Sequence, residues 1–199
     1  MNLPNKLTVL RIIMVPFFVA ALLLPGIPHH YLWAAVLFGL AALTDHYDGM
    51  LARKNNQVTN FGKFLDPLAD KILVVSALVC FVNLQLAATW CVLLIIAREF
   101  MVTSIRLVAM DSGVVIAANN WGKAKTVSQI IAIVAILIFQ YVQELITMGK
   151  LSAFTIVGMS SQAVFGTAGE VLILIATFFA LLSGVIYMVQ NIGVINTMK

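Results

Sequence analysis

Apolar residues fill six long runs of the chain, and the few charges in these runs lie mostly toward one end. Each run approaches the ~20 residues that a helix needs to cross the core of a bilayer. Apolar and polar positions do not alternate as they do in membrane barrels, so helices are the predicted spanning form. The predicted spans cover residues 8–24, 31–51, 65–84, 89–110, 127–146 and 165–190. Residues 1–7, with Pro4 and Lys6, allow for a short interfacial segment before the first span.

Composition strengthens this interpretation. Of the 199 residues, 62% are hydrophobic and 10% are charged, whereas a soluble domain averages about 25% charged residues. The first run lacks a small-residue cleavage site and further spans follow it, so we interpret it as a retained helix rather than a signal peptide. We predict an all-α integral membrane protein with six transmembrane helices, a single domain over residues 1–199 and no nucleic-acid partner.

Lysine and arginine are distributed unevenly between the two ends of the predicted spans. With the N-terminus in the cytoplasm, eleven of the twelve cationic residues fall on the inner side, and only Lys150 falls in an outer loop. Cytoplasmic loops of membrane proteins carry such an excess of positive charge. The pattern therefore predicts a multi-pass protein of the cell membrane with both termini in the cytoplasm.

Four of the eight acidic residues lie between the second and third apolar runs. Asp45 and Asp48 are three positions apart, and Asp66 and Asp70 are four apart, so each pair shares a helix face. A short polar loop joins the two helices, which are expected to pack antiparallel with their acidic faces meeting. Four carboxylates at close range cannot all ionise without a cation. Oxygen ligands suit Mg²⁺ or Mn²⁺, and two such ions fit phosphoryl or phosphatidyl transfer.

Two alternatives stay open in this segment. Pro67 either begins the third helix, with Asp66 as its N-cap, or kinks a helix that starts earlier. The aspartates themselves have a structural alternative, which is a set of helix caps and interfacial ion pairs with Arg53, Lys63 and Lys71.

The residues of this segment follow a fixed spacing, which is Asp45-x2-Asp48-Gly49-x2-Ala52-Arg53-x8-Gly62-x3-Asp66-x3-Asp70. This pattern resembles the signature of the CDP-alcohol phosphatidyltransferase family, position for position. The resemblance implies six transmembrane helices, a homodimer and two divalent metal ions bound by the four aspartates. It also implies that Asp70 acts as general base on the acceptor hydroxyl, which attacks the phosphorus attached to diacylglycerol and releases CMP.

The lipid substrate implied by this resemblance is CDP-diacylglycerol. Small residues on the aspartate face of a helix let a ligand approach the backbone closely, and the family signature assigns four positions to the cytidine diphosphate group. Three further polar residues lie at or near the first span, within reach of the diphosphate. The predicted CDP-diacylglycerol residues are Asn5, Thr8, Arg11, Gly49, Ala52, Arg53 and Gly62.

Outside the signature, residues 4–11, 97–100 and 122–126 are similar to the bacterial members of this family whose acceptor is glycerol 3-phosphate. That acceptor carries ~2 negative charges, and arginine and lysine are the side chains that bind phosphate. The predicted acceptor-phosphate residues are Arg98, Arg106, Lys123 and Lys125. Their alternative role is contact with anionic lipid headgroups. Glu99 is expected to pair with Arg98 or Arg106.

The resemblance therefore implies transfer of a phosphatidyl group from CDP-diacylglycerol to sn-glycerol 3-phosphate at the cytoplasmic face, giving phosphatidylglycerophosphate and CMP. One rival interpretation keeps this chemistry with serine or inositol phosphate as acceptor. A second rival is a divalent-cation transporter that uses the aspartates as its ion site. The transporter interpretation predicts carboxylates near the middle of the bilayer, and it gives no role to Gly49, Ala52 or Arg53.

Overall fold

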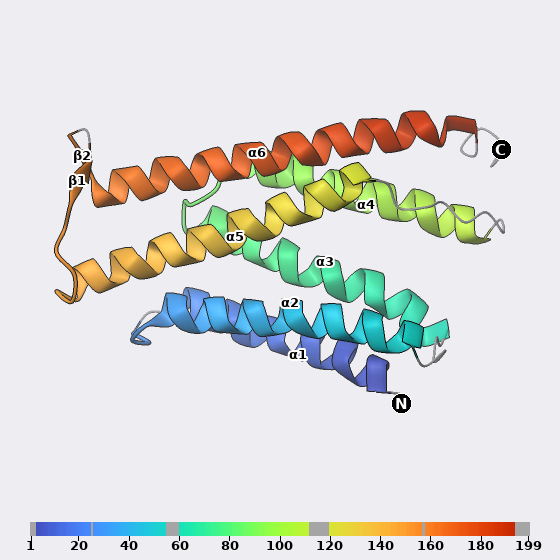
Figure 1. Ribbon diagram of the computed structural model, residues 1–199, viewed down its shortest axis with the longest axis horizontal. Helices are drawn as coiled ribbons and strands as arrows, with labels where there is room; N and C mark the ends of the chain where they lie inside the picture. Colours follow the sequence, from blue (N-terminus) through green and yellow to red (C-terminus); the bar gives the residue numbers. More distant parts are fainter. Residues whose placement is uncertain (1–2, 25, 55–59, 112–119, 157, 194–199) are drawn as a thin grey trace.

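The described part of the chain forms six long helices and one short hairpin in the computed structural model (Figure 1). The structure describes residues 3–24, 26–54, 60–111, 120–156 and 158–193, and side chains within 7–24, 26–44, 69, 71–109, 120–156 and 158–193. The elements are α1 (Leu3–Leu23), α2 (His30–Lys54), α3 (Asn60–Asn83), α4 (Thr89–Asp111), α5 (Asn120–Thr147), β1 (Thr155–Ile156), β2 (Met159–Ser160) and α6 (Ser161–Gln190).

Each helix corresponds to one of the six predicted apolar runs, so the helical prediction is confirmed, with one short hairpin in addition. The structure corrects one local expectation and decides one open alternative. α1 is continuous from Leu3, so residues 3–7 form no separate interfacial segment; Pro4 lies in the first helical turn, where proline is tolerated. α3 begins at Asn60 rather than at Pro67, so Asp66 is not its N-cap and the earlier-helix alternative holds.

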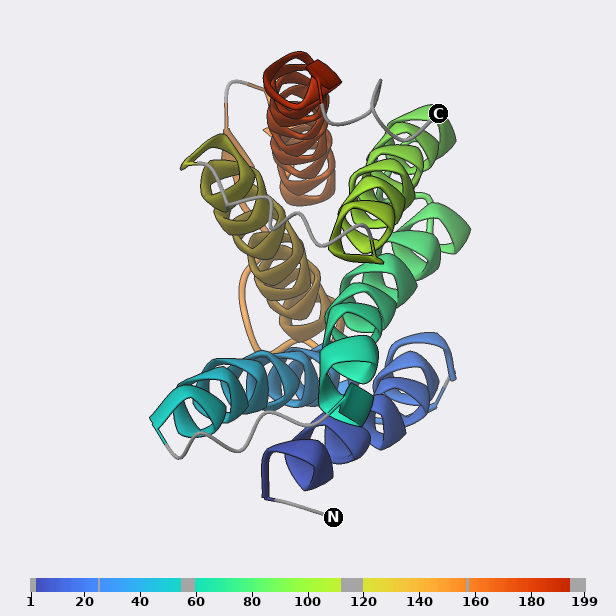
Figure 2. The same cartoon turned by 90° about the vertical axis from the view of Figure 1, so that its right-hand side faces the viewer.

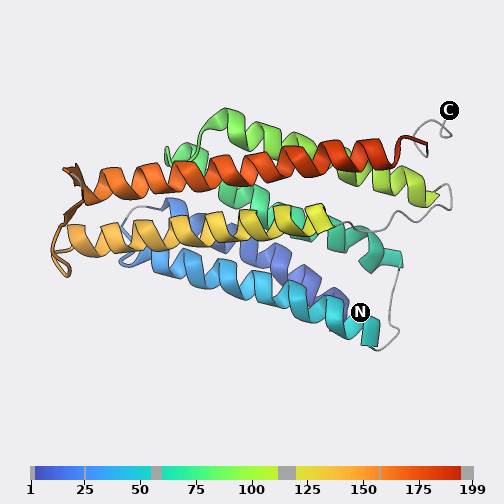
Figure 3. The same ribbon diagram turned by 45° about the horizontal axis from the view of Figure 1, so that its top comes forward.

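The helices alternate in direction, so two ends of the bundle can be distinguished (Figures 1 and 3). α1 begins and α6 ends at one end, on the right of Figure 1, which we call the terminal end. The end of α2, the start of α3, the end of α4 and the start of α5 lie there too. The opposite end carries β1 and β2, and we call it the hairpin end.

Helix α3 has the central position in the packing. It contacts α1 and α2 on one side and α4 and α5 on the other, while α6 packs on α4 and α5. Viewed from the terminal end, α1 and α2 lie at the bottom and α6 at the top (Figure 2). Most of the buried side chains are apolar. Phe18, Phe38, Phe81 and Ile95 are at most 1% exposed, and the rings of Phe18 and Phe38 are 5.8 Å apart.

The outward faces of the helices are apolar as well. Phe17, Leu93 and Phe178 are each 61% exposed, although Arg11 and Glu99 are buried. Large exposed apolar surfaces with polar groups inside are unusual for a soluble protein and suit contact with lipid. By length and composition, two of the described helices, α5 and α6, qualify as candidate membrane spans. The six-span topology therefore stays a prediction.

The hairpin between α5 and α6 was not expected from the sequence. β1 and β2 pair antiparallel, Thr155 with Ser160 and Ile156 with Met159, and Gly158 has φ of 77°. Strands of two residues are too short to give a periodic pattern. Phe165 of α6 stacks on Phe139 of α5 with centroids 5.1 Å apart, and Phe154, just before β1, meets the ring of Phe165 edge-on at 5.6 Å. These rings hold the chain before the hairpin against the bundle.

Candidate functional site

The four aspartates of the signature lie in helix backbone at the terminal end of the bundle. Asp45 and Asp48 belong to the last part of α2, and Asp66 and Asp70 to the first part of α3. Both stretches are continuous helix and the two helices contact each other, so spacings of three and four place each pair on one helix face. Their side chains lie outside the described residues, so the two-metal site stays a prediction.

The predicted lipid-substrate residues are described in part. Thr8 and Arg11 lie three positions apart on α1, and each is only 1% exposed. A buried guanidinium in an apolar helix is costly unless it is paired, and Arg11 does take part in an interaction within the protein. The side chains of the other predicted residues, Asn5, Gly49, Ala52, Arg53 and Gly62, lie outside the described residues.

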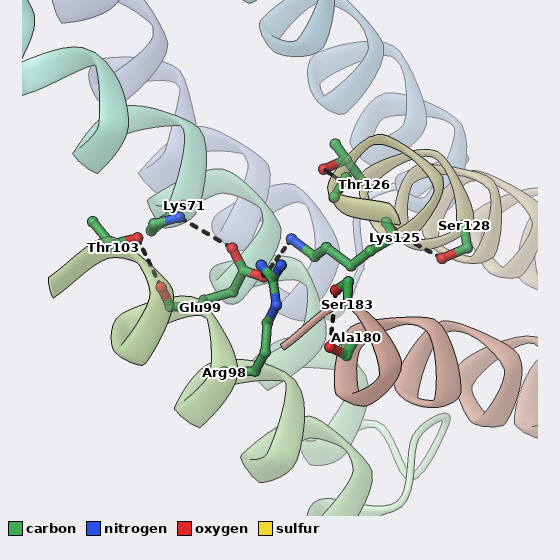
Figure 4. A network of polar contacts seen from close by, with 10 residues as sticks. Lys71, Arg98, Glu99, Thr103, Lys125, Thr126, Ser128, Ala180 and Ser183 are labelled. Atoms are coloured by element: carbon green, nitrogen blue, oxygen red, sulfur yellow. Dashed lines mark hydrogen bonds and ion pairs between the residues drawn. The ribbon is translucent and has the colours of Figure 1, made fainter. Parts of the chain in front are cut away.

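Glu99 of α4 is the centre of a buried network of ion pairs (Figure 4). Its Oε2 accepts a hydrogen bond from Lys71 Nζ of α3 at 3.0 Å, and its Oε1 accepts one from Arg98 Nη1 at 3.0 Å. Oε1 also pairs with Lys125 Nζ of α5. One carboxylate thus joins cations from three helices. The predicted pairing of Glu99 with Arg98 is confirmed, whereas Arg106 lies over the ring of Tyr187 instead.

A cavity of about 860 Å³ opens beside this network, between α3, α4 and α5. Apolar side chains such as Val74, Ile95 and Val102 form part of its wall. All four predicted acceptor-phosphate residues line it, together with Lys71 and with Glu99, the one carboxylate among the described lining residues. The cationic lining residues are Lys71, Arg98, Arg106, Lys123 and Lys125.

Among the side chains that the structure describes, the lining of the cavity carries more positive than negative charge. Glu99 supplies one negative charge to three adjacent cations, and Arg106 and Lys123 add two more. The Nε atoms of Arg98 and Arg106 are buried without a hydrogen-bond partner among the described residues. A buried donor without a partner costs about 1–3 kcal/mol. An anionic ligand with several acceptor oxygens would satisfy these donors and balance the charge.

Two members of the network, Lys71 and Glu99, were not predicted as site residues. Glu99 was expected only to pair with an arginine, and Lys71 was considered only as a partner of the aspartates. A signal did exist for both. Glu99 is the one acid within the fourth apolar run, and Lys71 directly follows Asp70. What the spacing does not reveal is that α3, α4 and α5 converge on one carboxylate.

The hairpin end holds a second buried acid, Glu144 of α5, which is 9% exposed. Its Oε1 accepts a hydrogen bond from the backbone N–H of His30 at 3.1 Å, where α2 begins. Next to it, Lys150 Nζ lies 3.0 Å from Nε2 of His29. Glu144 does not line the charged cavity. Among the described side chains, which do not include the four aspartates, no group of three or more acids, histidines or cysteines has metal-binding geometry.

Comparison with known proteins places these observations in a family. A family model described as "CDP-alcohol phosphatidyltransferase" matches residues 1–198. A Bacillus subtilis (strain 168) protein named "CDP-diacylglycerol--glycerol-3-phosphate 3-phosphatidyltransferase" is 49% identical over 157 residues, which are 73% of this chain and 81% of the relative. A Haemophilus influenzae protein of the same name is 40% identical over 66% of this chain and 73% of its own length. A "Probable phosphatidylglycerophosphate synthase" of Mycobacterium tuberculosis (strain ATCC 25618 / H37Rv) is 44% identical over 66% of this chain and 64% of its own length.

Proposed function

We propose that this chain, which belongs to the CDP-alcohol phosphatidyltransferase family, transfers the phosphatidyl group of CDP-diacylglycerol to sn-glycerol 3-phosphate. The products are phosphatidylglycerophosphate and CMP. Relatives that are 40–49% identical to the chain are named for this reaction. The charged cavity is the observation that carries the proposal, because its cationic lining suits a small phosphate ester with about two negative charges.

The cavity suits an acceptor with a phosphate group better than a neutral or zwitterionic one. The planar guanidinium groups of Arg98 and Arg106 match phosphate oxygens in pairs, and Lys123 and Lys125 act as point charges. Glu99 holds the ends of Lys71 and Lys125 in place before the acceptor arrives, so little side-chain entropy is lost on binding. Serine does not use this excess of positive charge. Inositol phosphate does, and it remains the second candidate acceptor.

The donor set of the four aspartates fits the metal ions that the family resemblance implies. It consists of carboxylate oxygens only, the ligands that Mg²⁺ and Mn²⁺ prefer, and the two helices that carry it meet at the terminal end. In our proposal Asp45, Asp48, Asp66 and Asp70 hold two such ions. When bound, the ions neutralise the charge that develops on the diphosphate of the lipid substrate.

Asp70 is the proposed general base. Its carboxylate takes the proton of the acceptor hydroxyl, and the hydroxyl oxygen forms a bond to the phosphorus attached to diacylglycerol. The bond between that phosphorus and the CMP oxygen breaks, and CMP leaves with the electron pair. Lys71 follows Asp70 directly in α3 and its Nζ binds Glu99. The proposed base and the wall of the acceptor cavity are therefore neighbours in one turn of helix.

The lipid substrate lies, in this proposal, on the α1–α2 side of the same end. α1 packs on α2 and α3, so buried Thr8 and Arg11 face the helices that carry the signature. Arg11 would offer its charge to the diphosphate, and the small signature residues would let the cytidine group approach the α2 backbone. The residues proposed for CDP-diacylglycerol are Asn5, Thr8, Arg11, Gly49, Ala52, Arg53 and Gly62.

We further propose that the protein spans the cell membrane, with the site and both termini in the cytoplasm. The apolar outer faces of the helices and the eleven cationic residues on the inner side support this orientation. In this placement the terminal end faces the cytoplasm, where a water-soluble acceptor would enter the cavity. From the family resemblance we also propose a homodimer. The molecular mass of the detergent-solubilised protein would test this oligomeric state.

The deciding experiment measures CMP release by purified protein supplied with CDP-diacylglycerol and Mg²⁺. Glycerol 3-phosphate, inositol phosphate and serine are offered in parallel reactions. We expect release with glycerol 3-phosphate, and loss of that release when the divalent ions are chelated. Release with inositol phosphate alone would keep the chemistry and replace the acceptor. Folded protein that is silent with every acceptor would contradict the proposal and favour the transporter interpretation.

A further inference from the structure

Helix α6 lies outside the lining of the charged cavity, yet it touches both arginines of that lining. A Cβ atom added to Gly184 would lie 2.9 Å from Cγ of Arg98. Three positions further on, the ring of Tyr187 lies 5.4 Å from Cζ of Arg106. Residues three apart share a helix face, so one face of α6 supports both guanidinium groups. Figure 4 shows Arg98 beside this stretch of α6, where Ala180 and Ser183 are labelled.

We propose that Gly184 and Tyr187 are positioning residues that set Arg98 and Arg106 for the acceptor phosphate. The inference rests on the proposed function, because it takes the two arginines as ligands of that phosphate. Neither residue of α6 touches the acceptor in this scheme. Both act through the arginine that they contact.

The contact with Gly184 fixes the path of Arg98. Cγ is close to the root of the arginine side chain, so it cannot swing aside as a terminal atom could. The far end of the same side chain is held by Glu99, at 3.0 Å. A methyl group at position 184 would therefore shift the guanidinium away from Glu99 or separate α4 from α6. Only glycine leaves room for the arginine at this crossing.

The neighbouring sequence shows why α6 approaches α4 so closely. Ala176, Ala180 and Gly184 recur at every fourth position and are buried on one face of α6. Small residues at this spacing let the backbones of two membrane helices come close together. The spacing alone would indicate packing. The arginine lying against Gly184 is what connects this packing to the cavity.

Tyr187 supports Arg106 in a way that leaves the arginine available. A ring face attracts the guanidinium through its π electrons and takes none of its N–H donors. Tyr187 is 3% exposed, so the contact is shielded from water. A carboxylate at this position would occupy the donors that a phosphate needs. Arg106 keeps a buried Nε without a partner among the described residues, and it lines the cavity.

The test compares Gly184→Ala with the matched variant Gly169→Ala. Gly169 is also a buried glycine of α6, and its added Cβ would lie 3.3 Å from Cγ1 of Ile136, away from the cavity. We expect Gly184→Ala to raise KM for glycerol 3-phosphate roughly tenfold, equal to about 1.4 kcal/mol. Its kcat and its KM for CDP-diacylglycerol should stay within about twofold of wild type. Gly169→Ala should leave all three constants unchanged.

A double-mutant cycle separates positioning from general loss of structure. If Gly184 acts only through Arg98, then Gly184→Ala should have no further effect on acceptor KM in an Arg98→Ala background. Equal effects in both backgrounds would overturn the inference. So would an unchanged acceptor KM in Gly184→Ala. These results differ from a failure of the proposed function, in which wild-type protein itself releases no CMP with glycerol 3-phosphate.

Tyr187 provides a second, independent variant in case Gly184→Ala does not fold. Tyr187→Leu removes the ring and should raise KM for glycerol 3-phosphate roughly fivefold, as expected for loss of a shielded cation–π contact. Tyr187→Phe keeps the ring and should raise it less. An acceptor KM that is unchanged in Tyr187→Leu, or equal in the two variants, would contradict the proposed role of the ring.

Discussion

Glu99 and Glu144 are both buried acids in apolar helices, but their carboxylates have different kinds of partner. Near the terminal end, Glu99 faces Lys71, Arg98 and Lys125, which come from three helices. At the hairpin end, Glu144 accepts a hydrogen bond from the backbone N–H of His30. The first N–H groups of a helix lack partners within it and carry partial positive charge, so Glu144 caps α2.

The comparison teaches that burial of a charge does not by itself indicate a ligand site. Burying an ionised carboxylate is costly wherever it occurs. The start of α2 offsets part of that cost for Glu144 within the fold, through the hydrogen bond from the His30 N–H, and Glu144 does not line the charged cavity. Around Glu99, the cations outnumber the carboxylate among the described side chains, and they line a cavity. The excess of one sign of charge around an open space is what distinguishes the site from the structural contact.

The sharpest contrast between the two ends is expected in catalysis. Asp70→Asn should lower CMP release by ~10³-fold or more, because removing a general base costs 10²–10⁴ and this residue is also a proposed metal ligand. Glu144→Gln, at the hairpin end, should keep wild-type turnover. Thermal unfolding of both variants controls for folding. Normal CMP release by Asp70→Asn would remove this aspartate from the role of base.

The next effect concerns stability and its dependence on anions. Glu99→Gln should lower the free energy of unfolding by about 3–5 kcal/mol, because three cations lose their shared partner. Inorganic phosphate should restore part of this loss by taking the place of the carboxylate. Unfolding temperatures measured with and without phosphate give the comparison. Phosphate should raise the unfolding temperature of Glu144→Gln no more than that of wild type. Equal rises in Glu99→Gln and Glu144→Gln would contradict the conclusion that only Glu99 lies beside an anion site.

Loss of the cap at the hairpin end should have a smaller effect. Glu144→Ala removes the acceptor for the His30 N–H and should cost about 1 kcal/mol, the usual cost of losing a helix cap. The KM values for both substrates should not change, since the cap lies away from the cavity. Thermal unfolding and steady-state kinetics on one preparation test both statements. A raised KM for glycerol 3-phosphate would show that the hairpin end takes part in acceptor binding.

The smallest effect is expected from an exposed cation. Lys123 lines the cavity but is exposed, so its attraction for phosphate is screened by water and salt. Lys123→Ala should raise KM for glycerol 3-phosphate roughly threefold, and less at high salt. Lys150→Ala removes a cation from the hairpin end and should leave KM for glycerol 3-phosphate unchanged at both salt concentrations. A similar effect of both variants would indicate general attraction by net charge instead of a local contact.

Hydropathy predicted all six helices, because the apolar runs are long and sharply bounded. It predicted their starts less well. An apolar run marks the part of a helix that is buried or meets lipid, whereas α3 and α5 begin earlier, at Asn60 and Asn120, in turns that also hold polar residues, glycine and lysine. Pro67 suggested a helix start on local grounds, and the continuous helix around it was the alternative that the structure adopts.

The candidate site could be predicted as a set of residues but not as an arrangement. Arg98, Arg106, Lys123 and Lys125 were grouped because they lie on one side of the predicted spans, and the structure brings them to one cavity. Their role toward the acceptor stays a prediction. The position of Glu99 between three helices, and that of Gly184 against Arg98, depend on contacts between distant segments. No local spacing encodes such contacts.

The small hairpin at the far end has a practical consequence for anyone who labels this protein. Both strands are exposed and only two residues long, and the stacked ring of Phe165 holds the chain just after them. Exposed loop tips of this kind accept insertions. An epitope placed between β1 and β2 would leave the opposite end of the bundle untouched. Accessibility of that epitope in intact cells and in permeabilised cells would then report which compartment the hairpin faces.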